Sequence, residues 1–259
     1  MKGMLTDVTK CIGCGQCVKG CTEANRLQEQ PSKLYHSRDG LSGQRFTTVI
    51  HIKKDGEDRY VRKHCRHCIE PACASACIVG ALQKTPEGAV IYDDGMCIGC
   101  RYCMMACPFG IPKYEWASAV PYVRKCTLCY ERFREGTIPA CVEACPEQAT
   151  IFGDRDELIA AAQQLIKDNP GKYIDRVYGE KEIGGTAVMY ISDAPLDFLA
   201  WKPNLDERPL PRYTWAALSK VPGIAFGVAA GMTGLYWIIE RRMKLSGGEP
   251  SPTAEGHHE

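Results

Sequence analysis

The segment CIGCRYCMMACP, residues 97–108, holds four cysteines spaced C-x-x-C-x-x-C-x-x-x-C and followed by proline. A close copy, CIGCGQCVKGC, occupies residues 11–21. Two more groups, at 65–77 and 126–146, keep the same order but have a longer gap between their second and third cysteines. These four groups contain all sixteen cysteines of the 259-residue chain. An internal repeat of cysteine groups therefore organises the fold.

Three kinds of chemistry use clustered cysteines. A disulfide scaffold suits short secreted chains that lack a sufficient core, and this chain is too long to need one. A structural zinc module uses C-x-x-C pairs set well apart, often with histidine, and it remains a remote alternative. The compressed spacing of groups one and three is the spacing that binds 4Fe–4S clusters. The pattern therefore predicts iron–sulfur clusters.

The spacing has a physical basis. Thiolate is a soft ligand that stays deprotonated on iron, and a C-x-x-C-x-x-C loop can wrap three thiolates around one cluster. Gly13 and Gly15 let the backbone of the first loop turn tightly. The fourth cysteine is expected to begin a helix and, as in two-cluster ferredoxins, to bind the neighbouring cluster. Sixteen cysteines then complete four 4Fe–4S clusters with none left over.

By analogy with ferredoxin symmetry, groups two and three form one unit and groups one and four form the other. The expected ligand sets are Cys11, Cys14, Cys17 and Cys145 for cluster A; Cys126, Cys129, Cys141 and Cys21 for cluster B; Cys97, Cys100, Cys103 and Cys77 for cluster C; and Cys65, Cys68, Cys73 and Cys107 for cluster D.

Short hairpins are expected between the groups. Residues 45–63 alternate around Asp55-Gly56, and residues 81–94 turn at 86–88. Residues 149–154 read as a further strand. Together with short helices at the last cysteine of each group, these elements predict an α+β fold made of two pseudo-symmetric bacterial ferredoxin-like units.

After residue 154 the cysteines end. Residues 156–168 have helical spacing, with Asp156 as the expected cap and 169–171 as the stop. Residues 188–191 read as a strand, and the proline-rich stretch 194–215 reads as an extended connector. The predicted domains are therefore a four-cluster ferredoxin domain, an extension with connector, a transmembrane helix and a disordered tail, at 1–154, 155–213, 214–240 and 241–259.

Residues 221–239 contain no charge, and nineteen residues suffice to cross a bilayer core of about 30 Å. Glu240-Arg241-Arg242-Met243-Lys244 follows this segment, whereas only Lys220 closely precedes it. By the positive-inside rule the tail faces the cytoplasm and the cluster domain faces the periplasm. Only ten residues precede Cys11, with no signal peptide or twin-arginine motif, so we expect export together with a signal-bearing partner.

Other functions find little support in the sequence. The net charge is +1, and no long basic run suggests a nucleic-acid partner. No nucleotide-binding loop, nucleophile elbow or other catalytic constellation is present, so no catalytic site is expected. His64 and His67 flank two cysteines, and we interpret them as loop packing or exposed residues rather than residues that tune a cluster.

Four segments carry a resemblance to a known family: CIGCRYCMMACPFGIPKYEW (97–116), KCTLC (125–129), ACVEACPEQATIFGDRDEL (140–158) and YGEKEIGGTAVMYIS (178–192). Over about residues 4–240 the chain resembles the iron–sulfur beta subunits of membrane-bound respiratory oxidoreductases. The YGEKE-x-GGT segment leans toward the subunit of hydrogenase-2-type nickel–iron hydrogenases, and the next match is the formate dehydrogenase-N beta subunit.

The resemblance implies an electron-transfer subunit of the inner membrane. It links a periplasmic catalytic partner, either hydrogenase small and large subunits or a formate dehydrogenase alpha subunit, to a multi-spanning quinone-reactive partner. This sequence departs from the hydrogenase-type subunit in one respect. That subunit usually has its own twin-arginine leader, and no such motif precedes Cys11 here. A formate dehydrogenase or another molybdenum or tungsten oxidoreductase is therefore the alternative.

Overall fold

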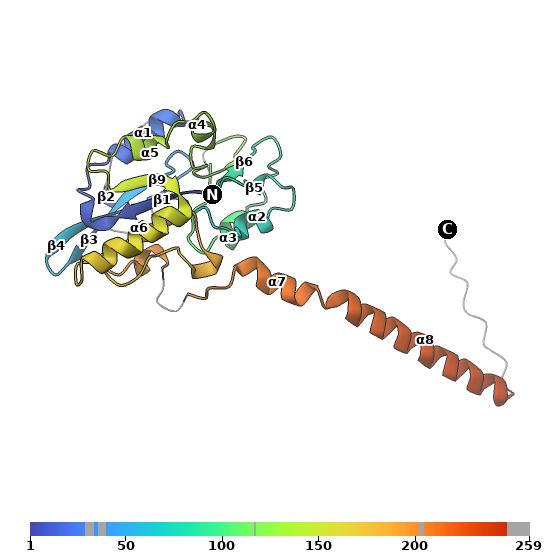
Figure 1. Ribbon diagram of the computed structural model, residues 1–259. Helices are drawn as coiled ribbons and strands as arrows, with labels where there is room; N and C mark the ends of the chain where they lie inside the picture. The colour runs from blue at the N-terminus through green and yellow to red at the C-terminus, as the bar shows by residue number, and fades with distance from the viewer. Residues whose placement is uncertain (29–33, 36–39, 117, 202–204, 248–259) are drawn as a thin grey trace. The chain divides into compact units, whose positions relative to one another are not determined.

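The computed structural model describes residues 1–28, 34–35, 40–116, 118–201 and 205–247. The chain divides into two units, Met1–Pro211 and Arg212–Glu259 (Figure 1). The first unit contains all sixteen cysteines. It is built from small sheets and short helices, which agrees with the α+β prediction.

A three-stranded sheet ties the two ends of the first unit together. The N-terminal strand β1 (Lys2–Asp7) lies between β9 (Thr150–Asp154) and β10 (Val188–Ile191). It runs antiparallel to β9 and parallel to β10. The strands β9 and β10 were expected, but β1 was not. Its six residues, which precede the first cysteine, are too few to show a recognisable strand pattern. Its central place depends on partners about 150 residues away.

Helix α6 (Arg155–Asp168) covers one face of this sheet. Its residues Leu158, Ala162 and Ile166 pack against buried side chains of β1 and β10. The helix begins two residues earlier than Asp156 suggested, because Asp154 is the cap and accepts a hydrogen bond from the Asp156 backbone N–H at 3.2 Å. It ends at Asp168 with Asn169 as its C-cap, as expected.

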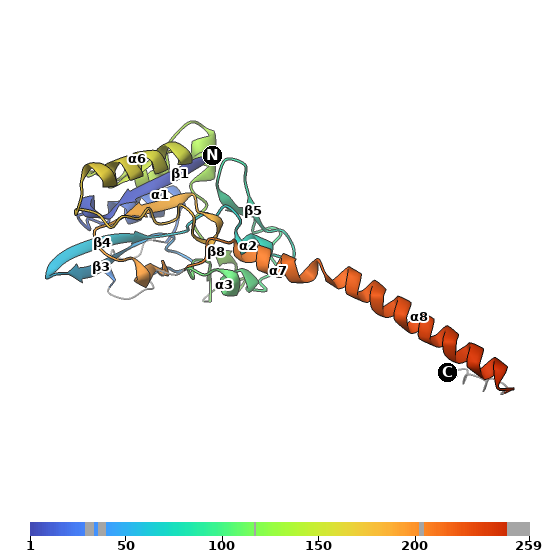
Figure 2. The same cartoon turned by 60° about the horizontal axis from the view of Figure 1, so that its bottom comes forward.

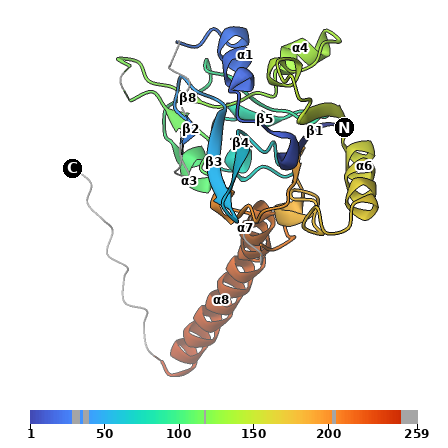
Figure 3. The same ribbon diagram turned by 90° about the vertical axis from the view of Figure 1, so that its left-hand side faces the viewer.

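The hairpin of β3 (Thr48–Lys54) and β4 (Glu57–Lys63) confirms the prediction for 45–63. Asp55 and Gly56 make its turn, both with positive φ. Strand β2 (Leu34–Tyr35) joins the other edge of β3 in parallel. The hairpin and α6 lie on opposite sides of β1 (Figures 2 and 3).

Two smaller hairpins complete the strands. They are β5 (Leu82–Lys84) with β6 (Val90–Tyr92), as predicted, and β7 (Lys113–Tyr114) with β8 (Val123–Arg124). Single-turn 3-10 helices η1, η2 and η3 occupy Val8–Lys10, Glu182–Gly184 and Asp197–Leu199.

Four short helices carry the third cysteine of each group. They are α1 (Gln16–Ala24), α2 (Ala72–Ser75), α3 (Tyr102–Ala106) and α5 (Ala140–Glu143). Helix α4 (Tyr130–Arg134) lies between the second and third cysteines of group four. Helix α1 packs against α5, and α2 packs against α3 (Figure 1). The expected helix start at the fourth cysteine is wrong, because each helix begins before the third cysteine, and α1 continues past the fourth.

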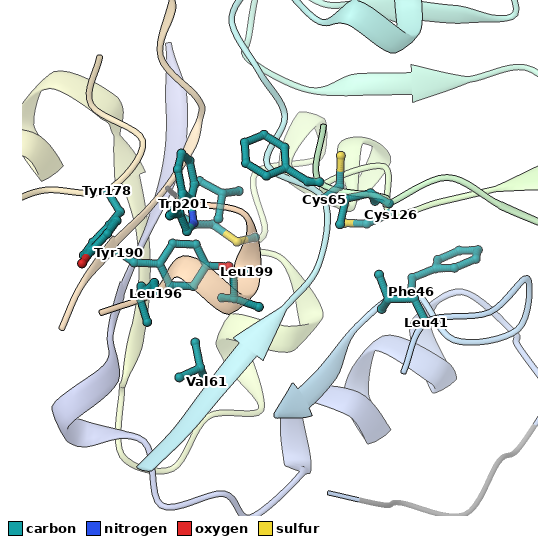
Figure 4. Packing of buried hydrophobic residues seen from close by; sticks show 14 of the residues in the cluster. Leu41, Phe46, Val61, Cys65, Cys126, Tyr178, Tyr190, Leu196, Leu199 and Trp201 are labelled. Carbon is teal, nitrogen blue, oxygen red and sulfur yellow. The ribbon is translucent and has the colours of Figure 1, made fainter. Parts of the chain in front are cut away.

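The stretch 194–215 is not the extended connector that its prolines suggested. Leu196, Leu199 and Trp201 are buried in the main core, beside Tyr178 and Tyr190 (Figure 4). The Trp201 ring lies 4.8 Å from that of Phe109, centroid to centroid. Burial of these apolar side chains holds the segment against the core, although its prolines disfavour regular secondary structure.

Two helices follow this anchor, α7 (Leu210–Leu218) and α8 (Val221–Leu245). Pro211 and Pro222 lie in the first turns of these helices. A backbone N–H in the first turn has no partner within the helix, so a proline there costs no hydrogen bond. The stretch Leu210–Leu245 is the one helix in the described part of the chain that is long and apolar enough to span a membrane. Helix α8 runs past the expected end at residue 240, and the predicted disordered tail falls partly on 248–259, outside the described residues.

Candidate metal centres

Cysteines of groups one and four meet at one pocket. Its thiols come from the loop after η1, from α1 and from the turn after α5, and they are Cys11, Cys14, Cys17 and Cys145. Val49 of β3 and Ala149 add apolar wall to the cavity. Three neighbours in sequence thus share a cavity with one cysteine from the far end of the repeat.

Cysteines of groups two and three meet in the same way. A second pocket is lined by Cys97, Cys100, Cys103 and Cys77. Leu82 of β5 and Val123 of β8 close it. Each of the two pockets combines three cysteines of a compact group with the last cysteine of a stretched group. The same arrangement of donors thus occurs twice.

The other eight cysteines interact in two further sets. The Cys21 thiol interacts electrostatically with those of Cys126, Cys129 and Cys141. The Cys68 thiol interacts with those of Cys65, Cys73 and Cys107. Each set again joins three cysteines of one stretched group to the last cysteine of a compact one.

The first loop of every group has the same backbone conformation. Its third residue has positive φ in all four cases: 73° at Gly13, 48° at His67, 71° at Gly99 and 65° at Leu128. A left-handed residue following right-handed ones turns successive N–H groups toward a common anion, which suits thiolates and cluster sulfides. The Leu128 N–H, for example, donates to Cys126 Sγ at 3.3 Å. The four groups thus repeat a positive φ at the same loop position as well as the order of their cysteines.

A second turn follows the fourth cysteine in three of the groups. The N–H groups of Gly80, Gly110 and Gln148 donate to the carbonyls of Cys77, Cys107 and Cys145 at 3.1, 3.1 and 3.2 Å. All three donors have positive φ. The proline after Cys107 and Cys145 is replaced by Ile78 after Cys77, yet the turn is the same. That sequence departure leaves the local geometry unchanged.

Burial controls the protonation of the thiols. It raises the pKa of Cys17 and of Cys73 to about 12 and that of Cys103 to about 11. Such thiols keep their protons at neutral pH unless a cation stabilises the thiolate. The donor set therefore fits iron, which supplies that charge.

Buried cations lie among the cysteines. Arg62 of β4 is 2% exposed and interacts electrostatically with the thiols of Cys17, Cys126 and Cys141. Lys84 is partly buried, and burial lowers its pKa to about 8. Its Nζ donates to the carbonyls of His67 at 3.0 Å and Gly88 at 2.8 Å. The sequence did not predict these cations, because nothing in a strand pattern distinguishes a buried arginine from an exposed one.

Both flanking histidines pack inside the protein. His64 and His67 are 1% and 0% exposed, so solvent exposure is wrong and loop packing is confirmed. His67 Nδ1 accepts a hydrogen bond from the Val90 N–H at 2.9 Å, and burial lowers the pKa of both imidazoles. His67 is neutral and holds β6 against the loop of group two.

The donor geometry fits a cluster better than a single ion. All sixteen cysteines are free thiols. Within the ranges that the structure describes, no three His, Cys, Asp or Glu side chains converge closely enough to hold one metal ion. The thiols surround cavities instead, and a four-iron cube keeps its four thiolates apart in this manner.

Comparison with known proteins agrees with this chemistry. A model of the 4Fe-4S dicluster domain matches residues 57–155, which include groups two to four. A protein of Nitratidesulfovibrio vulgaris is 42% identical over 255 residues, covering 95% of this chain and 69% of that protein. The hydrogenase-2 operon protein HybA of Escherichia coli O157:H7 is 38% identical over 242 residues, covering 79% and 74%. A formate dehydrogenase iron–sulfur subunit of Haemophilus influenzae is 36% identical over 198 residues, covering 72% and 63%.

Proposed function

The chain belongs to the family of 4Fe–4S iron–sulfur subunits of oxidoreductase complexes, and from this premise we propose that it carries electrons through four 4Fe–4S clusters. The clusters connect a periplasmic catalytic subunit to a quinone-reactive membrane subunit. A nickel–iron hydrogenase is the leading catalytic partner, motivated by the similarity to HybA over 79% of the chain. The chain itself transfers electrons and has no catalytic site.

The observation that carries this proposal is the crossed arrangement of the cysteines. Cluster A takes the set around the pocket of Cys11, Cys14, Cys17 and Cys145, and cluster C takes the set around the pocket of Cys97, Cys100, Cys103 and Cys77. Clusters B and D take the two remaining sets of interacting thiols. The packing of α1 on α5 and of α2 on α3 supports two pseudo-symmetric units of two clusters each.

The contacts between sets suggest an order for the four clusters. Cys103 of set C interacts with Cys73 of set D, Cys65 of set D with Cys126 of set B, and Cys141 of set B with Cys17 of set A. Cys65 and Cys126 lie side by side in the core (Figure 4). We therefore order the clusters C, D, B and A in one line, with the junction between the two units at Cys65 and Cys126.

Each part of the chain has a definite task in this proposal. When bound, the clusters supply one-electron redox chemistry. The cysteines hold them, the left-handed loops direct backbone N–H groups at sulfur, and the apolar walls at Val49, Leu82 and Val123 exclude water. Potentials follow from these hydrogen bonds, from nearby charge and from solvent access.

The same role beside a formate dehydrogenase or another molybdenum or tungsten enzyme is the second candidate. It is favoured by the similarity to a formate dehydrogenase iron–sulfur subunit over 72% of the chain. Both candidates place the helix at residues 214–240 in the inner membrane, after a cluster domain at 1–154 and an extension at 155–213. The charges after residue 239 favour a periplasmic cluster domain, exported with a signal-bearing partner.

Serine variants test the crossed pairing in the complex purified with mild detergent. We expect Cys145→Ser and Cys11→Ser to remove one and the same cluster signal from the electron paramagnetic resonance spectrum. Cys141→Ser and Cys21→Ser should both remove a different signal. Every variant should abolish quinone reduction while the catalytic partner still reduces artificial acceptors. If Cys141→Ser and Cys145→Ser remove the same signal, the crossed pairing is wrong.

Metal analysis of the same complex identifies the partner. Iron with nickel supports the hydrogenase, and iron with molybdenum or tungsten supports the second candidate. Zinc without excess iron would overturn the electron-transfer proposal itself.

A further inference from the structure

Arg62 is a buried cation whose hydrogen-bonding capacity is only partly used. Its Nη2 lies 3.0 Å from His64 Nε2 and 3.4 Å from Met4 Sδ. Its Nε and Nη1 are buried and have no hydrogen-bond partner among the residues that the structure describes. A guanidinium is always charged, so two nitrogens with three unpaired N–H groups at 2% exposure are costly unless an acceptor faces them.

The position of Arg62 places it beside the cysteines of groups one and four. It lies directly opposite Val49 in the β3–β4 ladder, and directly opposed residues share one face of the sheet. Val49 lines the cavity of Cys11, Cys14, Cys17 and Cys145. The charge of Arg62 also acts on the thiols of Cys126 and Cys141, which belong to set B. One guanidinium thus interacts with thiols of both cysteine sets of this unit.

No carboxylate forms an ion pair with Arg62 in the described part of the chain. The groups that stabilise its charge are thiols and the Tyr190 phenol. Two other buried arginines have partners outside the cysteine sets. Arg155 donates to the carbonyls of Thr186 at 2.8 Å and Glu180 at 2.7 Å. Arg66 places its guanidinium carbon 4.5 Å from the centre of the Tyr190 ring.

We propose that Arg62 sets the reduction potentials of clusters A and B, holding them higher than they would be without it. This inference rests on the proposed ligand sets. Reduction adds one electron to a cluster, and the Arg62 proton stays on the guanidinium throughout. A fixed positive charge, together with N–H groups facing sulfur, stabilises the reduced form more than the oxidised form. Burial strengthens both effects, since little water screens them.

The test is a redox titration of the full complex, followed by electron paramagnetic resonance. In Arg62→Met, which keeps the apolar length and removes the charge, we expect at least one cluster to become harder to reduce. The equilibrium constant for its one-electron reduction should fall by about tenfold, a decrease of about 59 mV. Arg155→Met is the matched control, because it removes a buried guanidinium that donates to carbonyls. It should leave all midpoint potentials unchanged.

Iron content separates this inference from the function on which it rests. A full complement of iron in Arg62→Met with unchanged midpoint potentials would overturn the role of Arg62 and leave the electron-transfer proposal intact. If Arg62→Met fails to assemble, Arg62→Gln decides the question, since it keeps buried N–H donors and loses the charge. A lowered midpoint potential in Arg62→Gln then supports the proposal, and an unchanged one refutes it.

Discussion

At the scale of single residues, Gly13 shows why the loops need particular side chains. Its φ is +73°, in the left-handed region. A Cβ at this position would lie 2.6 Å from the Tyr60 ring carbons. Both the backbone conformation and the space therefore require glycine. Leu128 and His67 adopt the same conformation in the stretched groups, which means that those two loops store strain that packing must offset.

Gly13→Ala should weaken the first centre. The left-handed backbone costs an alanine about 1–2 kcal/mol, and overpacking against Tyr60 adds about 1–3 kcal/mol. We expect fewer iron atoms per chain and a lower melting temperature. Gly56→Ala is the control, because Gly56 has positive φ but no atom within 4 Å of an added Cβ. Equal effects of both variants on iron content would contradict this account.

At the scale of elements, close helix contacts join cysteine groups that lie far apart in sequence. A Cβ on Gly20 of α1 would lie 2.9 Å from the Ala144 Cβ and 3.0 Å from the Ala140 carbonyl oxygen. The small residue therefore permits α1 and α5 to approach closely. This contact brings group one to group four, a pairing that the spacing of either group alone does not specify.

Gly20→Val should separate α1 from α5. Overpacking of this kind costs about 1–3 kcal/mol. We expect iron to be lost from clusters A and B first, while the resonance signals of clusters C and D persist. Lys19→Ala, on the exposed side of the same helix, serves as the control and should retain all iron. Uniform loss of all four signals in Gly20→Val would argue against two separate units.

At the scale of the whole molecule, the C-terminal unit differs from the cluster unit in how many of its apolar side chains are exposed. Its helices carry apolar side chains that are exposed within the unit, among them Phe226, Met232 and Trp237. A large exposed apolar surface needs a covering, and a lipid bilayer is the covering that the length of α8 suits. The cluster unit, by contrast, buries cores of its own.

Charges within α8 test this role. Gly227→Arg together with Gly231→Arg should add about 2.5–3.5 kcal/mol each to the free energy of insertion. We expect most of the chain to leave the membrane fraction after a high-salt wash. Met243→Arg is the control, because it also adds an arginine to α8 but places it after the uncharged stretch 221–239. It should leave the share of the chain in the membrane fraction unchanged. Similar membrane retention of the double variant and this control would contradict the anchoring role.

Local sequence determined much of this protein. The cysteine spacing indicated the cofactor. The Asp55-Gly56 turn and the strands at 150–154 and 188–191 followed from patterns a few residues long, and the apolar helix followed from one uncharged stretch of nineteen residues. These features depend on contacts between near neighbours, which a local pattern can encode.

Tertiary structure alone decided the rest. The placing of β1 between β9 and β10, the burial of Trp201 and the position of Arg62 beside two cysteine sets depend on partners more than forty residues away. The free energy of such contacts comes from the packing of distant segments, which neither composition nor periodicity records. For that reason the ligands were predictable from the sequence, whereas the charges around them were not.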